Sequence, residues 1–592
     1  MNMNEIQFLE QQYLQSLERC LRYIRSAERL SIEASIEELC KVLILQLCFE
    51  KKNAQTIRGK VSDFMLTDEK IESFYHRYFI KYVPGYAFKG WDFLKMGKGT
   101  FSKVVEELTH EPLYESNAKA KATGFTEFLQ MHYSGYLSEY STPKILSEYI
   151  MDVINPGKTI CLTDPCCGLG GMLVEAIIRN GNGIKVKGFD VNQRMVNTTN
   201  LHLMMYGYSE ARAECLDMLE IAMVYKEEPS DVIVSHFPYR HRTFSIAGKR
   251  DGSTERMFSR IQEDVIIGQI LKMLQPDGIA AVVVSDELLM SENREESRRW
   301  LYRNAQILNI TRFDGVAYKG NSSVRSYNVM FLRHSEYATS DVCMGTHIKA
   351  GESESEIQRT AQNVRKALLD GETDSKLNDN SKYFRLLAEE IWNVNLLFAR
   401  EKMGSKYPTC LLKDILVHDR QRVTIKDARN YKQLMVRSKG LGVVERENEY
   451  VGSSSSKAVR YVAKSGQVII SSLEAGKGAV GIVPKHLDNA LVSGNYYLFS
   501  IIRDDVDPEY LAMVLSSEPV LRQLNYHKRG NIMPRISIEK LKSLVIPKPS
   551  LDEQKKLVGS LVRKVKRVQQ LQDELEKEQT EFSWKLFGND EA

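Results

Sequence analysis

The spacing of apolar residues changes along the 592-residue chain, and the changes predict its domains. Residues 1–120 carry apolar side chains mostly at helical spacing, and residues 36–47 form one continuous apolar face, which predicts an α-helical N-terminal domain. Residues 121–345 instead contain short apolar runs typical of buried strands, such as 279–284, and helical stretches such as 172–179. We therefore predict an α/β domain for residues 121–345.

The remainder of the chain divides into three further parts. Residues 346–400 include a stretch rich in Ser, Glu, Asp and Asn, which predicts a connector that carries a helix or a loop. Residues 401–550 contain short β-rich segments separated by turn residues, typical of a mixed α/β domain. Residues 551–592 place side chains at three-four spacing, which predicts a coiled-coil helix. The positions concerned are Val558, Leu561, Val565, Val568, Gln572 and Leu575.

A glycine-rich segment in the second domain predicts a ligand site. Residues 163–173, Thr-Asp-Pro-Cys-Cys-Gly-Leu-Gly-Gly-Met-Leu, follow the apolar run 159–162 and precede a helical stretch, so they predict a strand, a glycine loop and a helix start. The loop lacks the Gly-Lys-Ser/Thr ending of a phosphate-binding loop and the third glycine of a dinucleotide fingerprint. Asp190 ends the next predicted strand, and a carboxylate at that place suits a ribose diol.

Four segments, in this order, resemble those of adenine-specific DNA methyltransferases, in particular the modification subunits of type I restriction-modification systems. Residues 135–143 resemble their Gly-x-Phe/Tyr-Thr-Pro segment, and residues 163–173 resemble their Asp-Pro-x-x-Gly-Ser/Thr-Gly-Gly-Phe/Met-Leu loop. Residues 217–219 resemble the Asp-x-Leu that flanks the cofactor adenine, and residues 274–278 the Leu-x-Pro-x-Gly before the fifth strand. The resemblance implies a Rossmann-like methyltransferase domain that uses S-adenosyl-L-methionine. The cofactor-binding residues that it implies are Thr142, Pro143, Asp164, Gly168, Gly170, Gly171, Asp190, Asp217 and Leu219.

The segment that would hold the target base departs from the family. Relatives carry Asn-Pro-Pro-Phe/Tyr after the fourth strand, whereas residues 235–239 are Ser-His-Phe-Pro-Tyr. In relatives the Asn or Asp oxygen and a backbone carbonyl hold the adenine amine, and the aromatic ring stacks on the flipped base. The resemblance therefore implies catalytic roles for His236, Phe237, Pro238 and Tyr239. A neutral imidazole offers one acceptor nitrogen for the amine, and a protonated imidazole offers none.

Two further positions differ from the family pattern. Leu169 replaces the small hydroxyl residue of the glycine loop, and Ser141 stands where an aromatic residue precedes Thr-Pro. These departures leave two interpretations open. One is a working enzyme whose sequence has drifted, and the other is a methyltransferase fold that has lost catalysis and kept DNA binding.

Positive charge is concentrated towards the C-terminus. Residues 401–570 hold 30 Lys and Arg against 17 Asp and Glu, whereas residues 1–400 hold 49 against 53. A polyanion contact is therefore expected in the C-terminal part. Residues 530–537, Gly-Asn-Ile-Met-Pro-Arg-Ile-Ser, and the Ile-Pro-Lys-Pro segment before Glu-Gln resemble one target-recognition domain of a type I specificity subunit. Candidates for DNA contact are Arg420, Arg422, Lys432, Arg437, Lys439, Lys528 and Arg529.

The resemblance also implies partners. Specificity subunits of the family have two recognition domains, each followed by a helix, and this chain has one of each, so we expect a homodimer on double-stranded DNA through the C-terminal helix. A separate restriction subunit, a nuclease or translocase, is a further partner that the resemblance allows. The nine cysteines include no Cys-x-x-Cys pair, so we expect no metal site and a cytoplasmic protein. No apolar run reaches the length of a membrane span, and residues 1–5 show no signal pattern.

The sequence thus predicts a modification-plus-specificity fusion of a restriction-modification or phage-defence system that methylates adenine N6 in a defined DNA sequence. The alternative is a non-catalytic DNA-recognition subunit that guides a partner. A third interpretation, an enzyme that methylates RNA or protein, is disfavoured by the predicted recognition domain.

Overall fold

The computed structural model divides the chain into two compact units, Met1–Val394 and Asn395–Ala592. It describes residues 3–110, 113, 118–133, 141–157, 160–208, 213–218, 220, 228–237, 261–317, 324–334, 342–369, 381–385, 392 and 394 of the first unit. In the second unit it describes residues 406–423, 430–446, 450–451, 460–526 and 535–587. Each unit is described by itself below.

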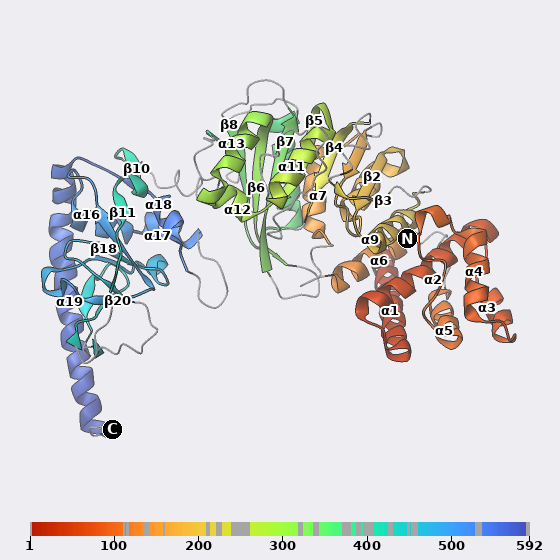
Figure 1. Cartoon of the computed structure of the whole chain (residues 1–592), viewed down its shortest axis with the longest axis horizontal. Helices are drawn as coiled ribbons and strands as arrows, with labels where there is room; N and C mark the ends of the chain where they lie inside the picture. Colours follow the sequence, from red (N-terminus) through yellow and green to blue (C-terminus); the bar gives the residue numbers. More distant parts are fainter. Residues whose placement is uncertain are drawn as a thin grey trace. The chain divides into compact units, whose positions relative to one another are not determined.

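The first unit begins with a bundle of helices, as the apolar spacing predicts (Figure 1). Its helices are α1 (Met3–Glu28), α2 (Ile32–Asn53), α3 (Arg58–Met65), α4 (Ile71–Tyr82), α5 (Lys98–Leu108) and α6 (Ala118–His132). The middle of α2 is buried all round, because the other helices of the bundle cover it. The bundle core also takes in side chains of the next domain, among them Leu169, Leu201 and Met205.

A nine-stranded sheet forms the centre of the same unit, in the order β3-β2-β1-β4-β5-β7-β6-β8-β9. The first five strands in this order are parallel, and β7 runs antiparallel between β5 and β6. The strands are β1 (Cys161–Asp164), β2 (Lys185–Asp190), β3 (Ala213–Cys215), β4 (Ser230–Ser235), β5 (Leu274–Val284), β6 (Ala305–Ala317), β7 (Val324–His334), β8 (Val342–Ile348) and β9 (Ser381–Arg385). This architecture confirms the predicted Rossmann-like fold.

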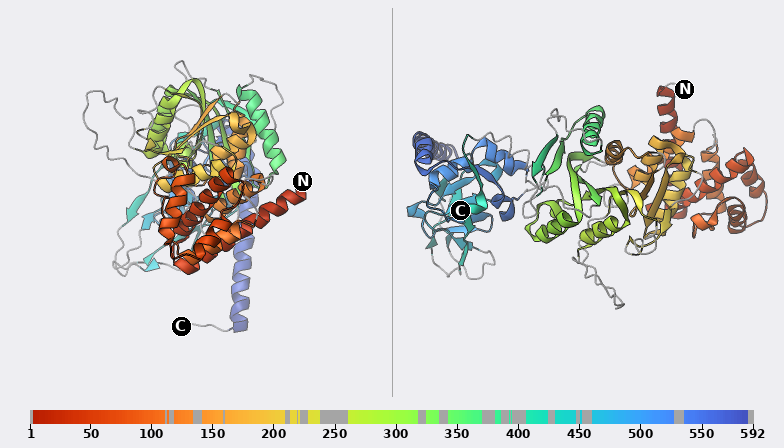
Figure 2. Two further views of the ribbon diagram at one scale, coloured as in Figure 1. Left: turned by 90° about the vertical axis from the view of Figure 1, so that its right-hand side faces the viewer. Right: turned by 90° about the horizontal axis from the view of Figure 1, so that it is seen from above.

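Helices cover both faces of the sheet, as the view from above shows (Figure 2). One face carries α7 (Lys144–Ile154), α8 (Gly171–Asn180) and α14 (Glu354–Leu369). The other carries α11 (Gln262–Met273), α12 (Asp286–Met290) and α13 (Glu295–Asn304), while α9 (Gln193–Met205) contacts β2, β3 and the helical bundle. The strand order changes beside β1, which lies between β2 and β4, so a ligand crevice is expected at the carboxyl ends of these strands.

The segment that we expected to be a connector differs from that expectation. Within residues 346–400, α14 buries Ile357, Ala361 and Val364 in the core beneath the sheet. After it, β9 pairs with β8 and extends the sheet by one strand. Because one face of α14 is apolar despite the polar composition around it, the methyltransferase domain includes this helix.

The second unit is β-rich and ends in one long helix. Its strands form a four-stranded sheet (β11-β21-β18-β19), a three-stranded sheet (β12-β17-β20) and three pairs, β10-β22, β13-β16 and β14-β15. They are β10 (Thr409–Leu411), β11 (Leu416–His418), β12 (Gln421–Val423), β13 (Asn430–Tyr431), β14 (Leu434–Val436), β15 (Val443–Glu445), β16 (Tyr450–Val451), β17 (Arg460–Val462), β18 (Val468–Ser471), β19 (Val480–Ile482), β20 (Leu491–Ser493), β21 (Tyr496–Ile501) and β22 (Val545–Pro547). The helices are α16 (Pro508–Leu515), α17 (Glu518–Tyr526), α18 (Ile538–Lys542) and α19 (Leu551–Phe587).

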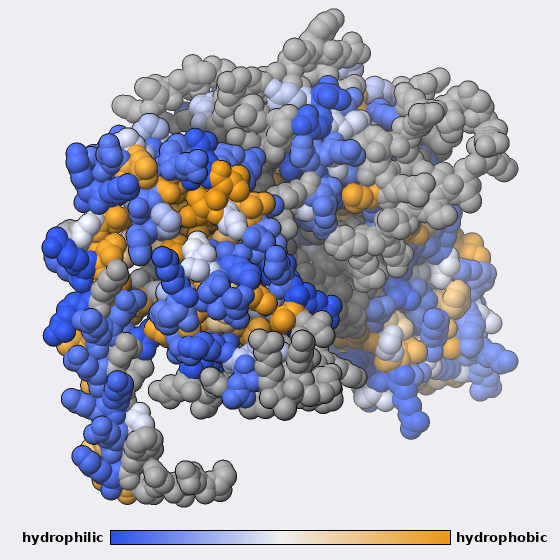
Figure 3. Space-filling view, turned by 60° about the vertical axis from the view of Figure 1, so that its left-hand side comes forward, coloured by the Kyte–Doolittle hydropathy of each residue, from blue (hydrophilic) through white to orange (hydrophobic). Residues whose placement is uncertain are grey.

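The helix α19 extends beyond the strands of its own unit, and its two faces differ (Figure 1). Val558, one of the predicted coiled-coil positions, is buried against the unit. Three other predicted positions, Leu561, Val568 and Leu575, remain exposed on the outer side. Leu557 and Leu571 join them at heptad spacing, so the outward apolar stripe includes these two leucines in place of Val558. Apolar side chains along the projecting part of α19 are visible in Figure 3.

Candidate cofactor and target-base site

The glycine loop between β1 and α8 has the predicted strand, loop and helix order. Gly168 and Gly170 have φ angles of 52° and 77°, which favour glycine. A Cβ atom on Gly170 would lie 2.7 Å from Cγ2 of Thr199, so α9 is packed directly beneath the loop. On its other side, the loop follows β1, which pairs with β4 through Leu162 and Thr163. The loop thus spans the point where the strand order changes.

Asp190 ends β2, as predicted, and its carboxylate braces the loop. The backbone N–H of Gly168 donates to Oδ2 at 3.0 Å, and the N–H of Asn192 donates to Oδ1 at 2.8 Å. Burial raises the pKa of Asp190, and these two hydrogen bonds oppose that effect. A carboxylate has about four lone-pair sites, so Asp190 can still accept the two hydroxyls of a ribose. The site therefore fits a nucleoside-containing cofactor.

Asp164, which opens the loop, is 3% exposed. Its Oδ1 accepts the N–H of Cys166 at 3.1 Å. Burial, with the nearby charge of Asp190, raises the pKa of Asp164 to about 8. This carboxyl group is consequently protonated at neutral pH, and its bond to Cys166 stabilises the first turn of the loop.

Asp217 lies at the same edge of the sheet as Asp190. The N–H of Leu216, just after β3, donates to the carbonyl of Asp190 at 3.1 Å, so the chain runs alongside β2 to its end. Asp217 follows and is exposed at this edge. Leu219, the other residue predicted to flank the cofactor adenine, lies outside the described residues.

The residues from the Thr-Pro segment and from the end of β4 come together. Nδ1 of His236 lies 3.3 Å from Oγ1 of Thr142, and the ring of Tyr327 on β7 meets the imidazole edge-to-face at 5.6 Å. Pro143 is the N-cap of α7, and a Cβ on Gly171 would lie 4.0 Å from the carbonyl oxygen of Thr142. Three segments that are distant in the sequence therefore meet beside the glycine loop.

Phe237 has a different environment from the rest of this segment. Its side chain is fully buried in the core, at 0% exposure, so only its backbone carbonyl is suited to contact a base. Pro238 and Tyr239 lie outside the described residues, as do residues 134–140 upstream of Thr142.

Three of the basic residues predicted to contact DNA adjoin the three-stranded sheet of the second unit. Arg422 is an exposed residue of β12, and the guanidinium of Arg420 lies 3.7 Å from the centre of the Tyr461 ring on β17. Lys432 forms an exposed ion pair with Glu445 at 3.1 Å. Such a pair contributes little to stability and leaves the ammonium available for exchange to a phosphate.

The other basic candidates lie in the turn between β14 and β15 or beyond the described residues. Lys439 is exposed and has a φ angle of 59°, and its N–H donates to the carbonyl of Lys477 at 2.8 Å. Arg437 begins the same turn, which packs on α19 through a hydrogen bond from Gln569 to the carbonyl of Leu441. Lys528 and Arg529 lie outside the described residues.

Comparison with known proteins assigns both units. Residues 127–388 match the family model of the N-6 DNA methylases, and residues 412–581 match that of the type I restriction modification DNA specificity domain. The chain joins an N6 DNA methylase domain to a type I specificity domain. The family resemblance predicted from the sequence is thereby confirmed, and the methylase family depends on S-adenosylmethionine.

Individual relatives are distant. The type II methyltransferase M.BanIII of Aneurinibacillus aneurinilyticus is 25% identical over 224 residues, which cover 34% of this chain and 37% of that protein. The tRNA (guanine(10)-N2)-dimethyltransferase of Methanothermobacter thermautotrophicus is 28% identical over 138 residues, covering 23% of this chain and 39% of the other. The chain therefore spans less than two fifths of the length of these two curated relatives.

A solved structure supports the fold of the methylase domain. The methyltransferase subunit of a type I restriction-modification system from Streptococcus thermophilus superposes with a TM-score of 0.50 at 12% identity, covering 63% of this chain and 95% of that one. At this identity the likeness extends to the fold alone.

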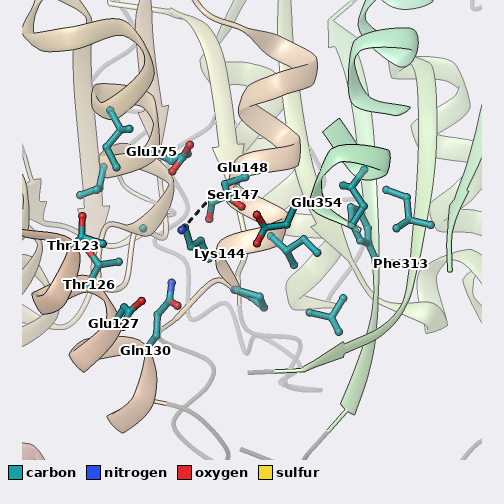
Figure 4. Close-up of a pocket in the computed structure, with 18 of the residues that line it drawn as sticks. Thr123, Thr126, Glu127, Gln130, Lys144, Ser147, Glu148, Glu175, Phe313 and Glu354 are labelled. Carbon is teal, nitrogen blue, oxygen red and sulfur yellow. Dashed lines mark ion pairs between the residues drawn. The ribbon is translucent and has the colours of Figure 1, made fainter. Parts of the chain in front are cut away.

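An acidic cavity of about 770 Å³ borders the methylase site (Figure 4). Pro143 and Gly171 line it on the side of the glycine loop. Lys144 pairs with Glu148 at 3.5 Å, while Glu148, Glu175 and Glu354 crowd the same wall. Burial raises the pKa of Glu148, and the other two carboxylates raise it further. The cavity is therefore unsuited to phosphate groups, and among the residues that the structure describes it contains no cluster able to hold a metal ion.

Three residues of the methylase site gave no signal in the sequence. Thr199 and His202 on α9 bond the carbonyls of the glycine loop, and Tyr327 on β7 contacts His236. Each comes from an element whose local sequence indicates only a helix or a strand, so the signal lies in tertiary contacts.

None of the helices in the described residues has both the length and the apolar character needed to cross a bilayer.

Proposed function

We propose that this chain is an S-adenosylmethionine-dependent DNA adenine-N6 methyltransferase that carries its own sequence-recognition domain, as part of a restriction-modification or phage-defence system. The observation that carries the proposal is the joining of an N6 DNA methylase domain and a type I specificity domain in one polypeptide. The geometry at the ends of β1, β2 and β4 supports it, because loop, acidic residue and Thr-Pro segment converge there.

In this proposal the cofactor lies across the carboxyl ends of β1, β2 and β3. Asp190 accepts the ribose hydroxyls, Asp217 and Leu219 flank the adenine, and the loop with its Asp164 brings backbone amides close at Gly168, Gly170 and Gly171. Thr142 and Pro143 lie at the methionine end. The cofactor supplies a methyl group on a sulfonium centre, which is electrophilic enough for transfer to an amine.

The chain's own contribution to the chemistry is to hold the target amine. His236 and the carbonyl of Phe237 accept hydrogen bonds from the two N–H groups of the amine. Pro238 and Tyr239 place an aromatic ring against the flipped base. Oγ1 of Thr142 lies 3.3 Å from Nδ1 of His236. When the threonine hydroxyl accepts a hydrogen bond from Nδ1–H, the imidazole proton is on Nδ1, so Nε2 is the nitrogen that can accept from the amine.

A second function is favoured by the Ser-His-Phe-Pro-Tyr segment itself. A fold that keeps cofactor and DNA binding without transfer would act as a recognition subunit for a partner. The two are separated by incubating the protein with tritiated cofactor and total DNA, and then identifying the methylated base. Transfer to adenine N6 supports the enzyme, and transfer only to guanine or to RNA contradicts it.

The variant His236→Asn restores the family residue and sharpens this test. It should keep or raise transfer, whereas His236→Ala should abolish transfer and retain binding of cofactor and DNA. Transfer by the wild type should also fall when the imidazole is protonated at acid pH. If wild type and His236→Asn are both silent, the recognition function stands.

We further propose that two chains bind double-stranded DNA as a dimer through α19. Its outer stripe is apolar, with Leu561, Val568, Leu571 and Leu575 exposed. Residues 551–570 hold six basic and two acidic side chains, and residues 571–587 hold two basic and five acidic ones. Antiparallel pairing therefore places opposite charges together. Two half-sites separated by a spacer should result, recognised through Arg420, Arg422, Lys432, Arg437, Lys439, Lys528 and Arg529.

A separate restriction subunit would complete such a system. We propose that this chain acts in the cytoplasm. All nine of its cysteines lie within the described residues and are free thiols, which suits a reducing compartment.

A further inference from the structure

The helix α9 connects the helical domain to the glycine loop. On its loop-facing side, the Thr199 hydroxyl donates to the carbonyl of Gly168 at 2.7 Å, and Nδ1 of His202 lies 2.9 Å from the carbonyl oxygen of Leu169. Because a carbonyl oxygen only accepts, Nδ1 must carry the imidazole proton. Two consecutive carbonyls of the loop are thereby turned towards α9.

The second nitrogen of the same imidazole reaches the helical domain. Nε2 of His202 lies 2.7 Å from Oγ1 of Thr126 on α6, and the hydroxyl of Tyr206 lies 3.1 Å from that same oxygen. The imidazole is 2% exposed, and burial lowers its pKa to about 4. It is therefore neutral at physiological pH, so Nε2 accepts from the threonine hydroxyl while Nδ1 donates to the loop.

Other residues of α9 fix it to the helical domain. Arg194 pairs with Glu33 at 3.1 Å and with Glu37 at 2.9 Å, both on α2. The side-chain amide of Asn197 donates to the carbonyl of Lys89 at 2.9 Å, and that of Asn200 donates to the carbonyl of Ala87 at 3.0 Å. A displacement of the helical domain must therefore move α9 or break these bonds.

The loop itself has a side chain in the helical core. Leu169 is 4% exposed and packs in the same cluster as Leu201 and Met205 of α9 and the bundle helices. The loop is thus held by the helical domain twice, through its carbonyls and through this side chain.

We propose that Thr199 and His202 are positioning residues that couple the placement of the helical domain to the shape of the glycine loop, and so to its affinity for S-adenosylmethionine. The affinity part of this inference rests on the proposed function of the loop. The shape part does not, because it concerns backbone hydrogen bonds of the protein alone.

Two substitutions at one position separate the two bonds of the imidazole. The amide nitrogen of Asn superposes on Nδ1, so His202→Asn keeps the bond to Leu169 and loses the one to Thr126. The amide of Gln reaches the place of Nε2, so His202→Gln keeps the bond to Thr126 and leaves the loop carbonyl unpaired. We expect cofactor affinity to fall about tenfold in His202→Gln, as loss of a buried hydrogen bond implies, and to fall less in His202→Asn.

Adjacent threonines provide a matched control. Thr199→Val removes the hydroxyl that donates to the carbonyl of Gly168, whereas Thr198→Val removes a hydroxyl that donates to the carbonyl of Arg194 on its own helix, at 2.9 Å. Both side chains are buried, and both changes conserve volume. Thr199→Val should weaken cofactor binding as His202→Gln does, and Thr198→Val should not.

Hydrogen exchange supplies a readout that needs no cofactor. In the free protein, the amides of Gly168 and Gly170 donate to Asp190 and to the Cys167 carbonyl, so both are protected. Exchange at residues 168–171 should be faster in His202→Gln and Thr199→Val than in Thr198→Val, at equal melting temperature or after correction for it. Equal exchange in all variants overturns the inference. If the wild type binds no cofactor, the proposed function fails, while the exchange pattern still decides the positioning role.

Discussion

Replacing Asp190 by Ala tests whether this carboxylate binds a ribose or only braces the loop. In the free protein it accepts N–H groups from Gly168 and Asn192, so its loss leaves two backbone donors without their partner. A hydrogen bond to a charged group contributes about 1.5–3 kcal/mol, but burial of the carboxylate, which raises its pKa, offsets part of this. We expect the free energy of unfolding to fall by about 1–3 kcal/mol.

Cofactor binding should weaken separately from this loss of stability. Loss of the charged hydrogen-bond partner of the ribose diol should reduce the free energy of cofactor binding by about 1.5–3 kcal/mol. This corresponds to an increase of about 10- to 150-fold in the dissociation constant. Calorimetric titration of folded protein with S-adenosylmethionine measures it, and urea unfolding measures stability.

Asp231 supplies the matched control for Asp190. Its carboxylate accepts the N–H of Cys161 at 2.7 Å and a bond from Gln275, at the amino ends of β1 and β4, away from the site. Asp231→Ala should therefore lower stability and leave cofactor affinity unchanged. If Asp190→Ala behaves in the same way, the carboxylate is only a structural brace and the ribose assignment is wrong.

Four further predictions follow from single features of the two units. The pKa of Asp164 is about 8 in the folded chain, against an ordinary value of 3.8. The free energy of unfolding should therefore fall as pH rises from 4 to 8, by up to about 1.4 kcal/mol per pH unit, and Asp164→Asn should flatten this slope in urea titrations. Leu169→Ser restores the family residue but opens a cavity in the helical core, so it should cost about 2–4 kcal/mol of stability in the same assay. Leu571→Glu should convert a dimer to a monomer in light scattering, and a monomeric wild type would contradict the pairing. Deleting residues 401–592 should abolish sequence-selective binding in competition shift assays, with the remaining binding weak and salt-sensitive.

Features encoded by a short stretch of sequence could be predicted. The glycine loop is encoded by two glycines with positive φ followed by a helix start, all within one short segment. Asp190 is recognised because it ends the next strand, which is also a local feature. The helical bundle and the long last helix likewise follow from local apolar spacing. For these helices the spacing of apolar residues directly reflects the helical geometry, so the sequence predicts them without knowledge of tertiary contacts.

Features that depend on contacts between distant segments could not be predicted. The composition of residues 346–400 indicates a connector, because the apolar residues of α14 that face the core are few among many charged ones. The exposed apolar stripe of α19 contains Leu557 and not the predicted Val558, because spacing alone cannot say which face of the helix its own unit covers. Tyr327 and His202 belong to the site only because the sheet order and the helical bundle bring them there.

The departures from the family pattern are of two physical kinds, and this bears on catalysis. Leu169 replaces a small hydroxyl residue, yet its side chain fills the helical core and its carbonyl is held by His202, so the change has a structural compensation. It is therefore no evidence that the cofactor loop has decayed. His236 replaces an acceptor that the chemistry uses directly, and its contact with Thr142 fixes the ring without replacing the lost oxygen. In the proposed enzyme, catalytic competence therefore depends on residue 236 more than on Leu169, and the decisive comparison is methyl transfer by wild type and His236→Asn when both bind cofactor equally.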